Sequence, residues 1–305
     1  MFYQLKDRLN RLRFAAQCGD IYKTPPLRLD AKSPLTVLSQ LQHKDLLLYL
    51  WAVKSFALRL PIGQVLVVND GTLTRGDRET LQRHIPGVRL IEINNIHTSP
   101  CPRGGTWERL LSIADSVGDR YIIQLDSDTL ALSTLPEIEN CISEGRSFVI
   151  GTWDRQEFEP MVERQKRAMA EVAKGNHHVQ VMAESNFDKL SGFTDMKYVR
   201  GCSGFSGFAP GSFTRGFVED ISRQMESALG KKWHEWGSEQ VMSNIVVANS
   251  PQAAVLPHPK YADCTKMRPS ETVFVHFIGT CRFKNGYYEQ LARAMSRTIH
   301  SGSKA

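Results

Sequence analysis

The feature that most constrains the fold is the alternation of short apolar runs with helix-forming stretches between residues 35 and 125. Apolar runs cover 35–41, 64–69, 88–93 and 120–125, and helical patterns lie between them at 44–60, 78–84 and 106–117. Such runs, rich in Val, Ile and Leu, are typical of strands buried on both faces. Strands that alternate with helices build βαβ units, and their right-handed crossovers place the strand ends along one edge. The sequence therefore predicts an α/β protein with a Rossmann-like, mixed but mainly parallel sheet flanked by helices.

Two carboxylates follow the last of these runs, in Asp126-Ser127-Asp128. Ligands of open α/β sheets bind beyond the carboxyl ends of the strands, so we expect both side chains at the mouth of a site. Two oxygen ligands on one short turn suit Mg²⁺ or Mn²⁺ bridging to a substrate phosphate. The alternative is that one Asp caps the next helix while the other is solvated, and the triplet alone does not separate these interpretations.

Three further segments carry polar or glycine-rich patterns. Asp70 ends the second strand, where an acid can accept hydrogen bonds from a ribose or a base, although Asp before Gly71 is also a common turn. The stretch 201–208 suits a backbone that passes close to a ligand, and the alternative is a β-bulge or an irregular loop. Glu239 follows Trp236 and a predicted N-cap, Ser238, so it either stabilises a first helical turn or serves as a base or hydroxyl ligand in a sugar site.

A late strand at 273–278 carries an imidazole and is followed by two cations. A neutral His276 is able to complete a metal site that two carboxylates begin, although a core histidine is the simpler interpretation for this residue alone. Arg282 or Lys284 would neutralise a departing diphosphate. No dinucleotide or P-loop glycine motif is present, which disfavours those classes of site.

Together these segments resemble the GT-A type of glycosyltransferase. The resemblance rests on Asp126-Ser127-Asp128, Asn69-Asp70-Gly71-Thr72, the stretch 203–208, Glu239-Gln240 and His276-Phe277-Ile278-Gly279. The last element is similar to the HxxGxxK ending of the family that includes glycogenin and bacterial lipooligosaccharide galactosyltransferases. Arg282 stands in the place of the family's lysine here, with Lys284 nearby.

The resemblance implies a transferase that moves a sugar from a nucleotide-diphosphate donor, UDP-linked, to a hydroxyl of a glycan or lipid-linked acceptor of bacterial type. It implies that Asp126, Asp128 and His276 hold Mn²⁺ or Mg²⁺. Glu239 would be the base of an inverting enzyme or would orient substrate in a retaining one. The implied donor contacts are Asp70, Arg109, Asp126, Gly279, Arg282 and Lys284, and the implied acceptor contacts are Ser206, Gly207 and Trp236.

We expect one large domain whose C-terminal half binds the acceptor. The predicted division is an N-terminal helical extension at 1–30, a nucleotide-sugar-binding half at 31–135, an acceptor-binding and catalytic half at 136–290, and a C-terminal tail at 291–305.

The first 17 residues form a basic amphipathic pattern with Phe2, Leu5, Leu9, Leu12 and Ala16 at helical spacing. This pattern is able to lie on an anionic membrane surface, whereas the favoured alternative is a helix packed on the domain with solvated charges. No apolar run reaches the roughly 20 residues that a membrane span needs. We therefore expect a cytoplasmic protein, with peripheral contact at the inner face of the membrane left open. The net charge is +6, but no nucleic-acid module is present, so no nucleic-acid partner is expected.

The six cysteines are scattered without CxxC pairing, which disfavours a zinc ribbon and predicts reduced thiols.

Two other functions compete with glycosyl transfer. A haloacid-dehalogenase-type phosphatase would use Asp126 as nucleophile and Asp128 as acid, because residues 122–130 match that motif. This class also needs a later acidic pair for Mg²⁺, which the sequence lacks. A non-catalytic sugar- or nucleotide-binding protein on the same fold is the second rival, and it is disfavoured by the intact site residues Asp126, Asp128, Glu239 and His276. If the metal interpretation holds, Asp128→Ala abolishes transfer and leaves the fold intact.

Overall fold

The computed structural model describes residues 2–279 and 281–301. Its largest sheet has seven strands in the order β10-β6-β9-β4-β1-β2-β3 and is mainly parallel and flanked by helices, which confirms the predicted α/β class. Two smaller sheets have the orders β11-β12-β5 and β7-β8. The strands of the large sheet are β1 (Leu35–Leu41), β2 (Gln64–Asn69), β3 (Arg89–Glu92), β4 (Tyr121–Leu125), β6 (Phe148–Ile150), β9 (Cys202–Phe208) and β10 (Ala254–Leu256).

The chain forms two compact units. The first unit comprises residues 1–90, 125–139 and 259–305, and the second comprises 91–124 and 140–258. The helices of the first unit are α1 (Phe2–Cys18), α2 (Leu46–Ala57), α3 (Arg75–His84) and α10 (Tyr287–Ser301), and its small sheet contains β5 (Thr129–Ala131), β11 (Tyr261–Asp263) and β12 (Phe274–His276). In the second unit lie α4 (Trp107–Ser116), α6 (Met161–Ala173), α7 (Val179–Ser185), α8 (Arg215–Leu229), α9 (Ser238–Ala248), β7 (Glu159–Pro160) and β8 (Lys197–Tyr198), while α5 (Pro136–Ser143) begins in the first unit.

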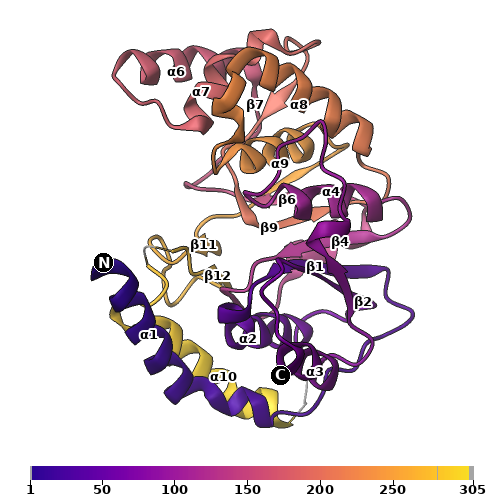
Figure 1. The fold of residues 1–305 in the computed structure, drawn as a ribbon, viewed down its shortest axis with the longest axis vertical. Helices are drawn as coiled ribbons and strands as arrows, with labels where there is room; N and C mark the ends of the chain where they lie inside the picture. Colours follow the sequence, from indigo (N-terminus) through magenta and orange to yellow (C-terminus); the bar gives the residue numbers. More distant parts are fainter. Residues whose placement is uncertain (1, 280, 302–305) are drawn as a thin grey trace. The chain divides into compact units, whose positions relative to one another are not determined.

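In the first unit the two terminal helices lie side by side and share a core with α2 (Figure 1). Phe14 of α1 and Tyr288 of α10 have ring centroids 4.6 Å apart, and Tyr288 stacks on Phe277 at 4.1 Å. Trp51 of α2 is buried, and its indole N–H donates to the carbonyl of Cys18 over 2.9 Å. Aromatic pairs of this kind stabilise a core beyond their buried area. Helix α1 is therefore an integral part of the first unit.

The exposed residues of α1 include leucines as well as cations. Leu5, Leu9 and Leu12 are 56%, 57% and 60% exposed, respectively. The structure has a helix at Phe2–Cys18, and the amphipathic extension expected for this region stays a prediction; the Phe2 side chain and residues 302–305 of the predicted tail lie outside the described residues. No helix in the described ranges is both long and apolar enough to span a bilayer.

The glycine-rich stretch 201–208 contains a largely buried strand, β9, and its expected contact with a ligand stays a prediction. It pairs antiparallel with β6, with a register irregularity at Val149 and Ile150. A Cβ at Gly207 would clash with the Phe148 ring, and one at Gly201 would clash with the Val149 side chain. The glycines therefore let large side chains of the neighbouring strand lie against the β9 backbone, which is a packing reason for this pattern.

The expectation of reduced thiols is wrong for two of the six cysteines. Cys264 and Cys281 form a disulfide, with Cα atoms 5.9 Å apart. Their separation of 17 residues carries no motif. Pairing of β11 with β12 brings them together, because Cys264 follows β11 and its N–H donates to the His276 carbonyl.

Candidate metal and transferase site

Two strands fix the positions of the three predicted metal ligands in the first unit. Asp126 and Asp128 follow β4, and β5 begins at the next residue, Thr129. Strand β5 runs antiparallel to β12, with Thr129 opposite His276. The N–H of Phe277 also donates to the carbonyl of Asp128 over 2.7 Å. Backbone hydrogen bonds thus hold the second carboxylate beside an imidazole that lies 148 residues later in the chain.

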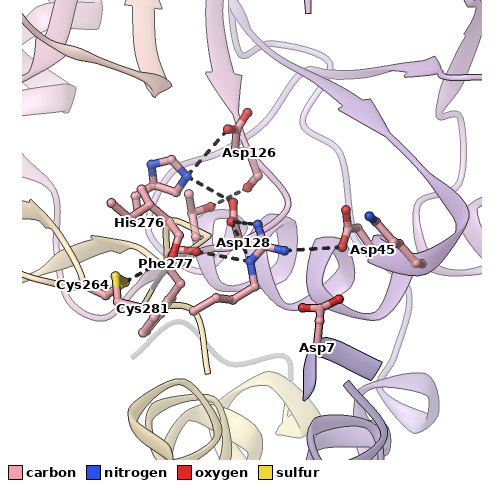
Figure 2. Close-up of polar contacts among 12 residues, drawn as sticks. Asp7, Asp45, Asp126, Asp128, Cys264, His276, Phe277 and Cys281 are labelled. Carbon is pink, nitrogen blue, oxygen red and sulfur yellow. Dashed lines mark hydrogen bonds and ion pairs between the residues drawn. A yellow bond between two sulfur atoms is a disulfide. The ribbon is translucent and has the colours of Figure 1, made fainter. Parts of the chain in front are cut away.

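One ligand atom from each of Asp126, Asp128 and His276 lies within 4.8 Å of the other two. The His276 Nε2 atom is 3.2 Å from an Asp128 oxygen and 3.7 Å from an Asp126 oxygen. Figure 2 shows the ring directed toward both carboxylates. The Asp126 side chain is 28% exposed, whereas those of Asp128 and His276 are 5% and 8% exposed. One ligand is therefore open to solvent while the other two are held in the protein.

The arrangement fits a divalent cation. Two carboxylate oxygens and one imidazole nitrogen form a donor set that Mn²⁺ accepts readily and that is compatible with Mg²⁺. The exposed Asp126 leaves one side of the cluster accessible, as a metal shared with a substrate phosphate requires. The three predicted ligands are thus brought together in one place.

Arg282 is a second partner of Asp128, beside His276. Its Nε and Nη2 atoms donate to one Asp128 oxygen over 3.0 and 2.5 Å. Burial alone would raise the pKa of the Asp128 carboxyl, but His276 and Arg282 outweigh it and lower this pKa to about 2. The carboxylate is therefore ionised at neutral pH, as a metal ligand has to be.

The other predicted donor contacts of this unit lie at its surface. Gly279 and Lys284 are exposed. Asp70 is partly buried and accepts hydrogen bonds from the backbone N–H and the hydroxyl of Thr72, over 2.9 and 2.7 Å. Asp70 thus forms the turn that the sequence offered as the alternative to a ligand contact. Its contact with a nucleoside stays a prediction.

In the second unit, Glu239 and Arg109 form a buried pair. An Arg109 Nη2 atom lies 3.3 Å from a Glu239 oxygen, and their side chains are 5% and 2% exposed. The same oxygen accepts a hydrogen bond from the Thr106 hydroxyl over 2.9 Å. Thr106 has a left-handed backbone, with φ 73°, at the start of α4. Such strained geometry in a non-glycine residue often accompanies functional sites. Sequence reasoning missed Thr106, because no pattern indicates a positive φ at a threonine.

The first turn of α9 differs from the expectation at Ser238. The structure assigns the N-cap to Gly237, and Ser238 is the first helical residue. The Ser238 hydroxyl instead accepts a hydrogen bond from the indole N–H of Trp107 over 2.9 Å. This bond joins α9 to α4, and these are the two helices that carry Glu239 and Arg109.

The three predicted acceptor residues lie in contrasting environments within the second unit. Trp236 is 76% exposed. Ser206 and Gly207 are buried in β9. An exposed indole offers a stacking face for a sugar. The acceptor role of Ser206 and Gly207 stays a prediction, and neither residue is exposed.

Comparison with known proteins identifies the fold. No family model matches the sequence, and no curated protein matches it. An active-site mutant of LgtC is similar, with a TM-score of 0.50, 9% sequence identity, and coverage of 85% of this chain and 95% of that one. The galactosyltransferase LgtC in complex with donor and acceptor sugar analogs gives a TM-score of 0.48 at 11% identity, with the same coverage. The apo-form glycosyltransferase GlyE of Streptococcus pneumoniae gives 0.49 at 13% identity, over 88% of this chain and 62% of that one. The LgtC mutant carries the conclusion that this chain has the GT-A glycosyltransferase fold, as the sequence predicted.

Proposed function

We propose that this protein is a metal-dependent glycosyltransferase that moves a sugar from a nucleotide-diphosphate donor to a hydroxyl acceptor. The observation that carries the proposal is the convergence of Asp126, Asp128 and His276 at the end of β4, on a GT-A fold. A phosphatase of the haloacid-dehalogenase type would need a second acidic pair to bind Mg²⁺. The side chains that contact Asp128 here are instead the imidazole of His276 and the guanidinium of Arg282.

The proposed division of labour follows from charge. A divalent cation held by the three ligands supplies Lewis-acid stabilisation of the leaving diphosphate. Arg282 and the exposed Lys284 add positive charge on the same unit, where negative charge grows as the glycosidic bond breaks. Asp70 is proposed to contact the nucleoside, and Gly279 to allow close approach of the donor.

Glu239 is proposed to orient substrate within the second unit. Its carboxylate already accepts hydrogen bonds from Arg109 and Thr106, and such contacts stabilise the charged form. A general base needs to accept a proton, so this environment favours an orienting role over proton abstraction. Trp236 is proposed as the stacking surface for an acceptor sugar; Trp236→Ala should raise the acceptor KM and leave donor hydrolysis unchanged.

The test is a screen of nucleotide-sugar donors, UDP-linked ones first, for slow hydrolysis with Mn²⁺, with Mg²⁺, and with EDTA. We expect one donor to be hydrolysed only with metal, and the Asp126→Asn variant to lose that turnover. Hydrolysis of a generic aryl phosphate without any nucleotide-sugar turnover would replace the proposal with the phosphatase. Tight nucleotide binding with no turnover of any donor would favour the binding protein.

We propose a lipid-linked or membrane-proximal acceptor, because the outward face of α1 combines the three exposed leucines with exposed cations. Lys6, Arg8 and Arg13 flank Leu5, Leu9 and Leu12, and the neighbouring α10 adds exposed Arg293 and Arg297. Each cation near an anionic surface contributes about 1 kcal/mol of attraction. The location consistent with this proposal is the cytoplasmic face of a membrane.

Vesicle flotation tests this docking. The protein should float with phosphatidylglycerol vesicles and not with phosphatidylcholine vesicles, and Leu5, Leu9 and Leu12 changed together to Ser should abolish flotation. Met169→Ser, which alters a residue of the second unit that is 57% exposed, is the control. If instead the leucine variant only dissociates a dimer in solution, a second copy of the chain is the partner of this face.

A further inference from the structure

A row of alternating charges runs from helix α1 to the proposed metal site within the first unit. Arg11 of α1 donates to an Asp45 oxygen over 2.6 Å. The Arg282 Nη1 atom lies 4.0 Å from the same oxygen, and Arg282 also binds Asp128, which contacts His276. Figure 2 shows Asp45 and Asp128 joined by dashed lines to the same guanidinium, which is that of Arg282. The row therefore joins an N-terminal helix to a candidate metal ligand.

Water is largely excluded from the centre of this row. The side chains of Asp45 and Asp128 are 7% and 5% exposed, and that of Arg282 is 19% exposed. A buried charge is costly unless an opposite charge neutralises it. Arg282 therefore needs a carboxylate partner in every state of the site, and two carboxylates are within its reach.

Asp128 already uses both of its oxygens. One accepts two N–H groups of Arg282, and the other lies 3.2 Å from His276 Nε2. A cation bound by the oxygen that faces His276 would add positive charge to a carboxylate that already neutralises Arg282 through its other oxygen, so the cation and the guanidinium would repel each other. Binding of a metal at Asp128 thus competes with Arg282.

Asp45 is built to receive the displaced guanidinium. Its second oxygen accepts a hydrogen bond from the Gln42 amide over 2.6 Å, and Arg11 holds the first. The Arg11 side chain is fixed in turn by Asp7 and by the carbonyl of Lys44. These contacts set the orientation of Asp45 without Arg282.

We propose that Arg282 is a resident counter-cation that competes with the metal for Asp128, and that Asp45 is a positioning residue that takes up Arg282 when metal binds. This inference rests on the metal site of the proposed function. It adds Arg282 as a competitor of the metal and Asp45 as the carboxylate that binds the displaced guanidinium. A purely structural ion-pair network predicts instead that Arg282 and Asp45 act on metal affinity only through their net charge.

The test measures binding of Mn²⁺ alone, by electron paramagnetic resonance of free Mn²⁺ and by calorimetry, at fixed pH and ionic strength. Arg282→Met should tighten binding about tenfold, a coupling typical of contacting charges. Arg282→Lys keeps the charge but loses the planar fork, and should tighten binding less. The Lys44→Met variant removes an equal charge from an exposed side chain and should change affinity less than Arg282→Met.

A double-mutant cycle isolates the role of Asp45. Asp45→Asn should weaken Mn²⁺ binding several-fold in the wild-type background, because Arg282 then stays on Asp128. The same change should have less than about a twofold effect in the Arg282→Met background. Asp7→Asn, which alters another carboxylate bound to Arg11, controls for charge at a more exposed position.

Each outcome decides between the two accounts. Equal effects of Asp45→Asn in both backgrounds, or no tightening in both Arg282→Met and Arg282→Lys, overturn the inference while the metal site stands. Absence of Mn²⁺ binding in the wild type overturns both the metal site and the inference. Thermal unfolding of every variant identifies any that fails to fold, and Arg282→Lys then carries the comparison in place of Arg282→Met.

Discussion

Replacing Asp128 should destabilise the protein as well as remove a metal ligand, whereas replacing Asp126 should mainly remove the ligand. The pKa of Asp128 is lowered from 3.8 to about 2 because His276 and Arg282 outweigh burial. This difference corresponds to roughly 2 kcal/mol of folding free energy at neutral pH. Asp128→Ala also leaves Arg282 without its principal partner, so we expect a total loss of about 2–4 kcal/mol. Asp126→Ala, at a more exposed side chain, should cost less than about 1 kcal/mol.

Urea unfolding in EDTA, followed by circular dichroism, measures both losses without metal. The stabilisation by Asp128 is complete above its unfolded pKa of about 3.8 and disappears as the pH falls toward 2, so the difference between wild type and Asp128→Ala should shrink below pH 4. Both variants should lose metal-dependent donor hydrolysis. Equal, near-wild-type stabilities of the two variants at pH 7 would refute this reasoning, and so would a stability gap that persists unchanged at pH 2. Asp126→Ala is therefore the variant that tests metal binding with little loss of stability, although the sequence alone favoured Asp128→Ala for this test.

Three further outcomes are expected. Glu239→Gln should lower donor turnover by about 100-fold, since the charge opposite Arg109 is lost, and unchanged kcat would remove Glu239 from the proposed site. Cys264→Ser should cost about 3 kcal/mol in urea unfolding, because the Cys281 bond closes a loop of 17 residues; dithiothreitol should destabilise the wild type equally, and an unchanged midpoint in both would show that the bond is absent. Burial lowers the pKa of His84 from 6.5 to about 4, so its contribution to stability is present above pH 6.5 and is lost as the pH falls through 4. Thermal unfolding of His84→Gln at pH 7 and 5 should show a smaller pH effect than the wild type, and equal effects would contradict this.

The sequence predicted β1 to β4 of the large sheet, because the signal for buried parallel strands is local. The runs at 35–41 and 64–69 match β1 and β2 residue for residue, since both strands are apolar and end at polar turns. The three proposed ligands could also be picked out from the sequence, because two of them follow a buried strand and the third lies in another apolar run. The contact of β5 with β12, which brings them together, carries no local signal, so only the resemblance to a known fold joined them.

Other features depend on contacts that no short segment encodes. The glycines of 201–208 suggested close approach of a ligand, yet two of them are needed because Phe148 and Val149 of the neighbouring strand lie against them. A glycine that accommodates a ligand and a glycine that accommodates a neighbouring side chain look the same in sequence. The structure separates them by showing which side chain fills the space.

Arg282 illustrates why charge roles are harder to predict than ligand identity. Its position after the HxxG element suggested a cation for the leaving diphosphate, and sequence gave no reason to connect it with Asp128 or Asp45. In the structure it already donates two hydrogen bonds to one Asp128 oxygen, so we expect a bound metal to reposition this guanidinium. A lysine at the same place would present a point charge in place of a fork with two donors on one oxygen. The arginine therefore couples the empty and loaded states of the site more tightly than a lysine would, and the Arg282→Lys variant measures that difference directly as a change in Mn²⁺ affinity.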